Sequence, residues 1–418
     1  MSNSKLVNPW YVGIVSGMAS YIDSAAIISN GTALVLYQEA LGITPNQIGI
    51  LSGVLTLCIA VGAFTGGRLG DCYGRRRIFL ITMLAIILGT LLLTWGGAFG
   101  FLLIGTTLIG LGTGADLPVS LAAISEAADD HNRGKIIGLS NILWTVGICV
   151  TMAVASIVGG WGKLGAQIMY LHVCIVAAII FILRCFIPES SMWLKAKSER
   201  QLGLATVRAK KSNYLDIFKG VYLWPFIALS LFYTLTNLAA NTGGQFGAYV
   251  AVHYVGIPVE TASLWGLMLL PVAIGSGALF MKIVDTNKRM PFFVIGAVFF
   301  SGGYFIPVVF NFSPASWFCS MLFIMLGNGL AFEGIMKVWA QESFPTMLRS
   351  TAQGLIVGIA RLTCGILAFV TPALLKASPQ LVFALLSTIV AVGMIIGWLC
   401  FHKGRRNEFN SEGELHHR

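Results

Sequence analysis

The chain has 418 residues, of which 56% are hydrophobic and only 11% are charged, and its mean hydropathy is +0.81. Soluble globular proteins carry roughly 25% charged residues. This composition therefore excludes an ordinary soluble domain and predicts an all-α protein that crosses a lipid bilayer many times.

Twelve segments are long and apolar enough to span a bilayer, which takes roughly 20 apolar residues for a helix. In chain order they cover residues 11–36, 47–69, 78–96, 100–126, 136–159, 165–187, 221–252, 260–282, 291–311, 315–340, 351–375 and 379–401. The even number places both ends of the chain on one side of the membrane.

The positive charge, a formal +10, falls on alternate connections between these segments. For example, Arg75–Arg77 follow the second segment, and seven Lys or Arg residues occupy 195–219 after the sixth. The connections that follow the odd-numbered segments carry only Lys163 and Lys376. Basic residues favour the cytoplasmic side. We therefore expect both termini and the 195–219 segment to be cytoplasmic, and we expect no nucleic-acid partner.

The chain divides into two related halves. Asp71, Glu126 and Arg133 in the first half recur as Asp285, Glu342 and Arg349 in the second, each 214 to 216 residues later. We predict an N-terminal six-helix bundle (1–194), a cytoplasmic linker (195–219), a C-terminal six-helix bundle (220–402) and a cytoplasmic tail (403–418). Parallel repeats of this kind are a known plan of transporters.

Three motifs carry a family resemblance. They are the run from Gly67 to Arg77, the sequence Pro188-Glu189-Ser190, and the Glu/Arg signatures after the fourth and tenth segments. Together they resemble the major facilitator superfamily and, more narrowly, its sugar-porter and metabolite–proton symporter group. Cys72 departs from the pattern, because a basic residue is usual there. The resemblance implies twelve transmembrane helices in two pseudo-symmetric six-helix bundles that alternate access to a central cavity.

The resemblance also implies a cytoplasmic gate of ion pairs that form and break between two states. Small residues would let the membrane helices approach closely there. The alternative is that these residues only orient the loops. The expected gate residues are Gly67, Asp71, Gly74, Arg75, Glu126, Arg133, Asp285, Arg289, Glu342 and Arg349.

Two acids lie at membrane depth, where ionisable residues are costly and are functional candidates. Asp23 lies in a run similar to the Gly-Tyr-Asp-Thr sequence of sugar–proton symporters, whose aspartate carries the proton. Asp116 lies in a run similar to the fourth helix of phosphate–proton symporters, while Thr106 replaces the sugar-porter arginine. We predict proton coupling at Asp23 and Asp116. The alternative for each is a structural role in helix packing.

The predicted substrate-binding residues combine charged, amide and aromatic side chains. Glu333 and Lys337 share one helix face, and Arg361 lies near the middle of the eleventh segment. Arg and Lys facing a cavity suit an anionic group, although Glu333 and Lys337 could instead neutralise each other. The full set is Asn141, Trp144, Asn237, Asn241, Gln245, Trp265, Phe332, Glu333, Lys337 and Arg361.

These observations predict a secondary transporter of a small polar metabolite, working as a monomeric proton symporter in a bacterial inner membrane. A sugar acid or other organic anion is favoured over a neutral sugar or polyol, and uniport or efflux on the same fold stays open. No enzyme activity is expected, because the loops offer only Asp129, Asp130 and His131 as a polar cluster. The eight cysteines show no CxxC spacing, so we expect no metal and no cofactor.

Overall fold

The computed structural model describes residues 8–127, 133–191, 193–194, 197–198, 217–218, 220–284, 286–344 and 346–402. Side chains are not described at positions 71, 125, 133–138, 141, 221, 341 and 346–351. The chain forms two compact units, Met1–Lys211 and Ser212–Arg418, and each is described by itself below. The boundary between them falls inside the segment that the sequence suggests is a linker.

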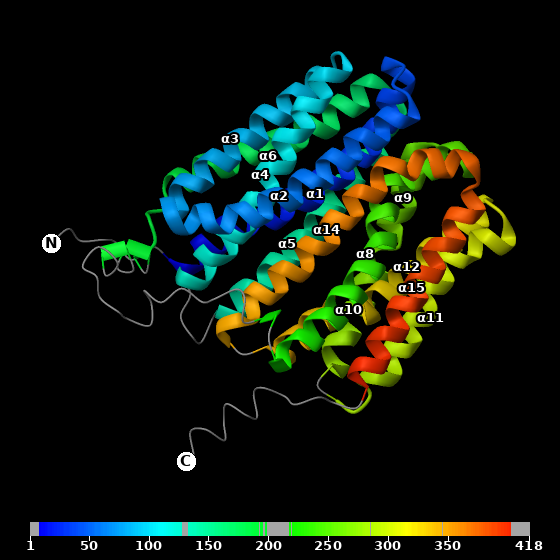
Figure 1. The fold of residues 1–418 in the computed structure, drawn as a ribbon. Coiled ribbons are helices and arrows are strands. Elements are labelled where there is room, and N and C mark those ends of the chain that lie inside the picture. The colour runs from blue at the N-terminus through cyan, green and yellow to red at the C-terminus, as the bar shows by residue number, and fades with distance from the viewer. Residues whose placement is uncertain are drawn as a thin grey trace. The chain divides into compact units, whose positions relative to one another are not determined.

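The described residues of the first unit form six long helices, coloured blue to green in Figure 1. Their bounds are α1 Pro9–Leu41, α2 Pro45–Tyr73, α3 Arg75–Trp95, α4 Phe99–Ala127, α5 Arg133–Val158 and α6 Lys163–Cys185, with a short 3-10 turn, η1, at Gly159–Trp161.

The second unit repeats the plan with more interruptions. Its elements are η3 Gly220–Tyr222, α8 Leu223–Val250, a π-helical turn η4 Ala251–Val255, α9 Val259–Met268, α10 Leu270–Ile283, α11 Arg289–Phe310, α12 Pro314–Ala331, α13 Glu333–Ser343, α14 Thr346–Ala377 and α15 Pro379–Phe401.

Twelve stretches of the described residues are long and apolar enough to cross a membrane, from Pro9–Leu41 to Pro379–Phe401. They coincide with the twelve predicted segments to within a few residues, which confirms the all-α polytopic fold. Polar caps and prolines explain several of the helix starts. Thr44 is the N-cap of α2 and forms a reciprocal capping box with Gln47, and Pro45 occupies the first helical position. Ser378 is the N-cap of α15, where its hydroxyl accepts the amide of Leu381 and Pro379 follows.

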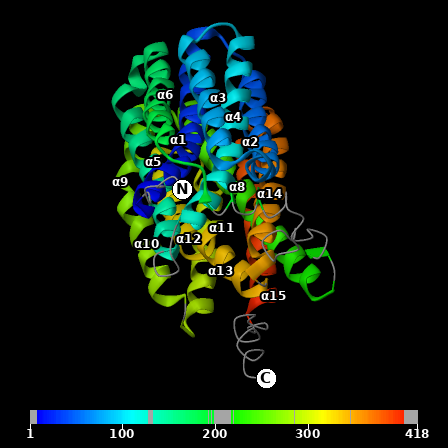
Figure 2. The same cartoon turned by 90° about the vertical axis from the view of Figure 1, so that its left-hand side faces the viewer.

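Helices α2 and α4 cross with their backbones in contact, and they lie side by side in Figures 1 and 2. A β-carbon on Gly66 of α2 would lie 2.4 Å from the carbonyl oxygen of Ala115, and one on Gly114 of α4 would lie 2.1 Å from that of Ile59. Without a hydrophobic driving force between helices in lipid, such close backbone packing by small residues stabilises helix pairs.

The predicted spans 260–282 and 315–340 are both present, as Val259–Ile283 and Pro314–Ala340, and each contains a break in its helix. The first breaks at Leu269, where Pro271 has no backbone N–H to continue the ladder. The second breaks at Phe332, whose φ of −111° and ψ of −104° lie outside the helical region. Both breaks lie in the second unit.

Candidate functional site

Two ion pairs occupy matching places in the repeat, where each unit turns from one long helix into the next. In the first unit Arg75 at the start of α3 binds Glu126 at the end of α4, with Nη2 and Oε1 2.8 Å apart. In the second unit Arg289 at the start of α11 binds Glu342 on α13, with Nη1 and Oε1 2.7 Å apart. The structure thus brings together four of the residues that were expected to form a gate.

Glu189 adds a contact that the sequence reasoning did not foresee. Gly74, at the N-cap position of α3, has no side chain that could cap the helix. The carboxylate of Glu189 instead accepts hydrogen bonds from the backbone amides of Arg75 at 2.8 Å and Arg76 at 3.3 Å. An acid at a helix N-terminus satisfies unpaired amides and complements the helix dipole. The Pro-Glu-Ser motif is therefore tied to the start of α3, some 110 residues earlier.

Gly74 is required by this arrangement. Its φ is +100°, a conformation that other residues rarely adopt, and a β-carbon there would lie 2.3 Å from Oε2 of Glu189. Gly70 approaches α4 of its own unit, since its β-carbon would lie 3.0 Å from Val119, while a β-carbon on Gly67 would meet only Pro118 at 3.9 Å.

Several predicted residues fall where the structure is not described. These are the whole of Asp285 and the side chains of Asp71, Arg133, Asn141 and Arg349. Their roles stay predictions.

The two acids at membrane depth in the first unit have different surroundings. Asp23 lies buried in the middle of α1, with a side chain that makes further interactions. Asp116 on α4 forms a buried ion pair with Arg184 of α6. Arg184 was missed by the sequence reasoning, although a single arginine inside the apolar segment 165–187 was a usable signal.

The second unit gathers most of the predicted binding residues. Nζ of Lys337 lies 2.8 Å from Oε1 of Glu333 on α13, and these two side chains are 30% and 37% exposed. Arg361 on α14 lies near enough to act electrostatically on Glu333. On α8, the thiol of Cys364 from α14 donates to Oδ1 of Asn237 at 3.4 Å.

Amide and aromatic groups continue this cluster along α8. Nε2 of Gln245 donates to Oδ1 of Asn241 at 3.2 Å. Phe332, at the break before α13, stacks on Tyr233 of α8 with ring centroids 5.6 Å apart and planes inclined by 14°. Within this unit α8 therefore contacts α14 through Asn237 and Cys364 and contacts Phe332 through Tyr233, while Arg361 of α14 lies near Glu333 of α13.

Each of the two other predicted aromatic residues takes part in a contact that joins two helices. Trp265 of α9 meets Phe318 of α12 edge to face at 5.4 Å. Trp144 of α5 is half-buried, and its carbonyl oxygen accepts a hydrogen bond from Ser24 of α1 at 2.9 Å. Their roles in binding stay predictions.

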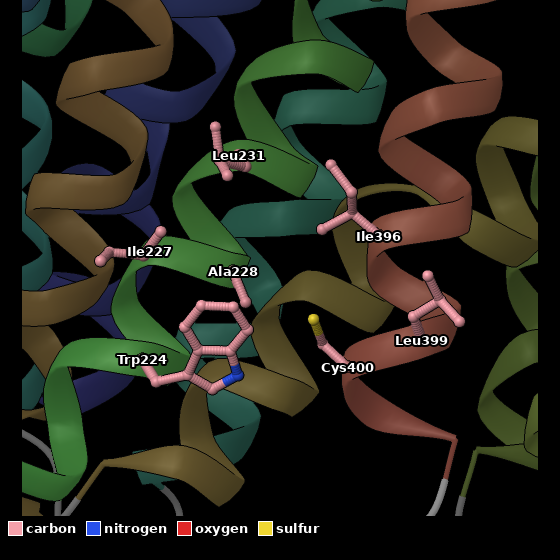
Figure 3. A pocket seen from close by; sticks show the side chains of 7 residues that line it. All are labelled: Trp224, Ile227, Ala228, Leu231, Ile396, Leu399 and Cys400. Atoms are coloured by element: carbon pink, nitrogen blue, oxygen red, sulfur yellow. The ribbon is translucent and has the colours of Figure 1, made fainter.

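An apolar hollow of about 390 Å³ lies between α8 and α15, and Figure 3 shows its lining. Its walls are Trp224, Ile227, Ala228, Leu231, Ile396, Leu399 and Cys400. Trp224 and Leu399 are more than half exposed. None of the lining residues is a predicted binding residue, and a wall with no charged group offers little to a polar metabolite.

Residues 12–368 match the family model described as Major Facilitator Superfamily. The chain belongs to this family. It is therefore a secondary transporter of small metabolites and not an enzyme, as the sequence predicted.

Curated relatives within the major facilitator superfamily extend over most of the chain. The minor myo-inositol transporter of Bacillus subtilis is 31% identical over 92% of this chain and 89% of its own length. A probable 4-methylmuconolactone transporter of Cupriavidus pinatubonensis is 25% identical over 77% of this chain and 73% of its own length.

Solved structures share the fold. A crystal structure of a D-xylose–proton symporter superposes with a TM-score of 0.76 at 17% identity, covering 93% of this chain and 97% of that one. A crystal structure of a POT family transporter in complex with 5-aminolevulinic acid gives a TM-score of 0.74 at 14% identity, covering 94% of this chain and 96% of that one. At these identities the likeness concerns the fold alone.

Proposed function

We propose that this protein imports a neutral polyhydroxylated compound, such as a cyclic polyol or a sugar, together with protons. It would do so by exposing one binding site to the two sides of the membrane in turn. The observation that carries the substrate class is the ion pair between Glu333 and Lys337. The charge of Lys337, which had favoured an anionic cargo, is already balanced by a carboxylate 2.8 Å away.

A half-exposed Glu–Lys pair suits hydroxyl groups. The carboxylate offers acceptors and the ammonium offers donors, so adjacent hydroxyls of a polyol can bridge the two. The amides of Asn237, Asn241 and Gln245 supply both kinds of group, and the Phe332–Tyr233 stack supplies an apolar face for a ring. The myo-inositol transporter among the relatives is consistent with this class.

An organic anion is the second candidate, and Arg361 is the observation in its favour. With Glu333 and Lys337 it gives the cluster a formal charge of +1. A carboxylate on the cargo would balance that charge, and a guanidinium binds carboxylates in a fixed two-point geometry.

Proton coupling is proposed because buried carboxylates are available at membrane depth, and Asp23 is 3% exposed. A proton on such a group changes its charge in apolar surroundings, so its loading can bias a conformational equilibrium. We further propose that both termini are cytoplasmic, because basic residues lie on alternate connections. A bacterial plasma membrane and a monomeric state are proposed with it.

Uptake by the purified protein in liposomes tests both parts. With labelled myo-inositol outside and a proton gradient directed inward, we expect accumulation that a protonophore abolishes. Excess scyllo-inositol or another neutral polyol should compete, whereas glucuronate should not. Competition by glucuronate alone would favour the anion, and uptake indifferent to the protonophore would contradict proton coupling.

A further inference from the structure

Both oxygens of Asp116 are occupied by donors from its own unit. Nη1 of Arg184 donates to Oδ1, and Nη2 of Arg184 donates to Oδ2 at 2.9 Å. The hydroxyl of Thr82 donates to Oδ1 at 2.9 Å, and that of Ser120 lies 3.4 Å from Oδ2. The arrangement joins α3, α4 and α6, which lie side by side in Figures 1 and 2.

The pair is closed to solvent. Asp116 is 1% exposed and the side chain of Arg184 is 0% exposed. The guanidinium carbon lies 4.4 Å from the centre of the Phe79 ring, and Nη2 also donates to Ser120 at 3.1 Å. The apolar side chains of Ile78, Phe79, Val119 and Ala123 cluster in the same part of the unit. Both charges are therefore buried within the unit.

This geometry does not suit a carboxylate that must gain and lose a proton in each transport cycle. A guanidinium has donors only, so a proton on Asp116 would set an O–H against an N–H and leave the buried cation without its partner, which is strongly unfavourable. Among the described residues, Arg184 is the charged group that contacts Asp116.

We propose that Arg184 is a positioning residue that fixes Asp116 as a lasting ion pair between α4 and α6, so that proton coupling in this unit rests on Asp23. The proposal rests on the proton coupling proposed above. It removes Asp116 from the predicted proton-coupling residues. Asp116 and Arg184 together then have a structural role.

Transport by variants in liposomes separates the two acids. The double variant Asp116→Asn/Arg184→Gln removes both charges together, and it should still accumulate myo-inositol under an inward proton gradient. Asp23→Asn should retain exchange of labelled for unlabelled myo-inositol and lose accumulation. A double variant that exchanges but does not accumulate would overturn the proposal, because Asp116 would then carry the coupling.

The thermal stability of the same proteins tests the pair without any transport. The variants Asp116→Asn and Arg184→Gln each leave one buried charge alone, so each should lower the apparent Tm more than the double variant does. If the double variant is destabilised by the sum of the two single shifts, the two side chains do not act as a pair and the proposal fails. This measurement holds even if the protein proves not to be proton-coupled.

Labelling of the unaltered protein avoids any dependence on variants that fold poorly. Dicyclohexylcarbodiimide reacts with protonated carboxyl groups in apolar surroundings, and mass spectrometry locates the product. We expect a label on Asp23 that rises as the pH falls, and none on Asp116. A pH-dependent label on Asp116 would contradict its lasting pairing with Arg184.

Discussion

The Asp116–Arg184 pair of the first unit and the Glu333–Lys337 pair of the second both lie within membrane-spanning helices, yet they differ in exposure. The side chains of Asp116 and Arg184 are 1% and 0% exposed, and together with Thr82 they join three helices. The side chains of Glu333 and Lys337 are 37% and 30% exposed, and they lie beside a helix break.

A sealed ion pair holds helices in one arrangement, because separating the charges would leave each of them in an apolar interior. A half-exposed pair is cheaper to separate, since water or a polar ligand can take the place of either partner. We infer that the first unit supplies a firm interior and that the second supplies adaptable contacts for cargo.

The most damaging single change should be Gly114→Ala, which tests how tightly the first unit is closed. The added β-carbon would lie 2.1 Å from the backbone oxygen of Ile59, and neither backbone can move without separating α2 from α4. Overpacking of a core costs about 1–3 kcal/mol and more against backbone. We expect little folded protein by size-exclusion chromatography. Gly100→Ala, in the same helix with nothing within 4 Å, is the matched control and should elute normally.

Gly74→Ala should come next, with a loss of about 2–3 kcal/mol. The conformation of Gly74, with φ +100° and ψ 153°, is essentially restricted to glycine and costs a residue with a side chain about 1–3 kcal/mol. Displacement of the Glu189 carboxylate also removes the cap of α3. Gly162→Ala is the control. Gly162 also has a positive φ, +56°, but a β-carbon there would have no atom within 4 Å, so this variant has the conformational cost without a steric clash. Equal shifts of apparent Tm in the two variants would show that the Glu189 contact contributes nothing.

Lys337→Met should reduce uptake of myo-inositol about tenfold, which corresponds to about 1.4 kcal/mol, and leave the apparent Tm nearly unchanged. The half-exposed pair contributes little to stability, whereas the cargo loses a donor. Lys282→Met, at an exposed lysine of α10, should transport normally. A large fall in Tm with normal transport by the remaining protein would reverse the contrast drawn between the two units.

The smallest effects are expected at the two ion pairs that recur in the repeat, Arg75–Glu126 and Arg289–Glu342. The side chains of Arg75 and Glu126 are 10% and 18% exposed, and those of Arg289 and Glu342 are 21% and 28% exposed. Glu126→Gln should therefore lower stability somewhat more than Glu342→Gln, with both losses within about 1 kcal/mol. Thermal unfolding at low and high salt checks this, since the more exposed pair should show the stronger screening.

The twelve membrane spans could be predicted from the sequence, because a helix that crosses a bilayer needs a long apolar run and such runs are evident in the sequence. It was also sufficient to indicate Arg75, Glu126, Arg289 and Glu342, because the same spacing recurs in both halves. The breaks at Leu269 and Phe332 were not predicted, since hydropathy does not report a local change in backbone direction.

The partners of individual side chains were harder to predict. Arg184 and Glu189 lie 68 and 114 residues from Asp116 and Arg75, the residues that they contact. No local pattern encodes such pairings, because helix packing creates them. Glu333 and Lys337 were predicted to bind substrate, and that role stays a prediction; their ion pair now favours a neutral cargo over an anionic one.

The contact between Gly74 and Glu189 constrains how these two positions can change during evolution. A lineage that replaced the glycine with a larger residue would push the acid out of its place, and one that lost the acid would relieve the crowding that forbids a methyl group at 74. Mutational drift at these two positions should therefore be coupled, and a homologue with alanine at the first should tolerate a short or neutral residue at the second.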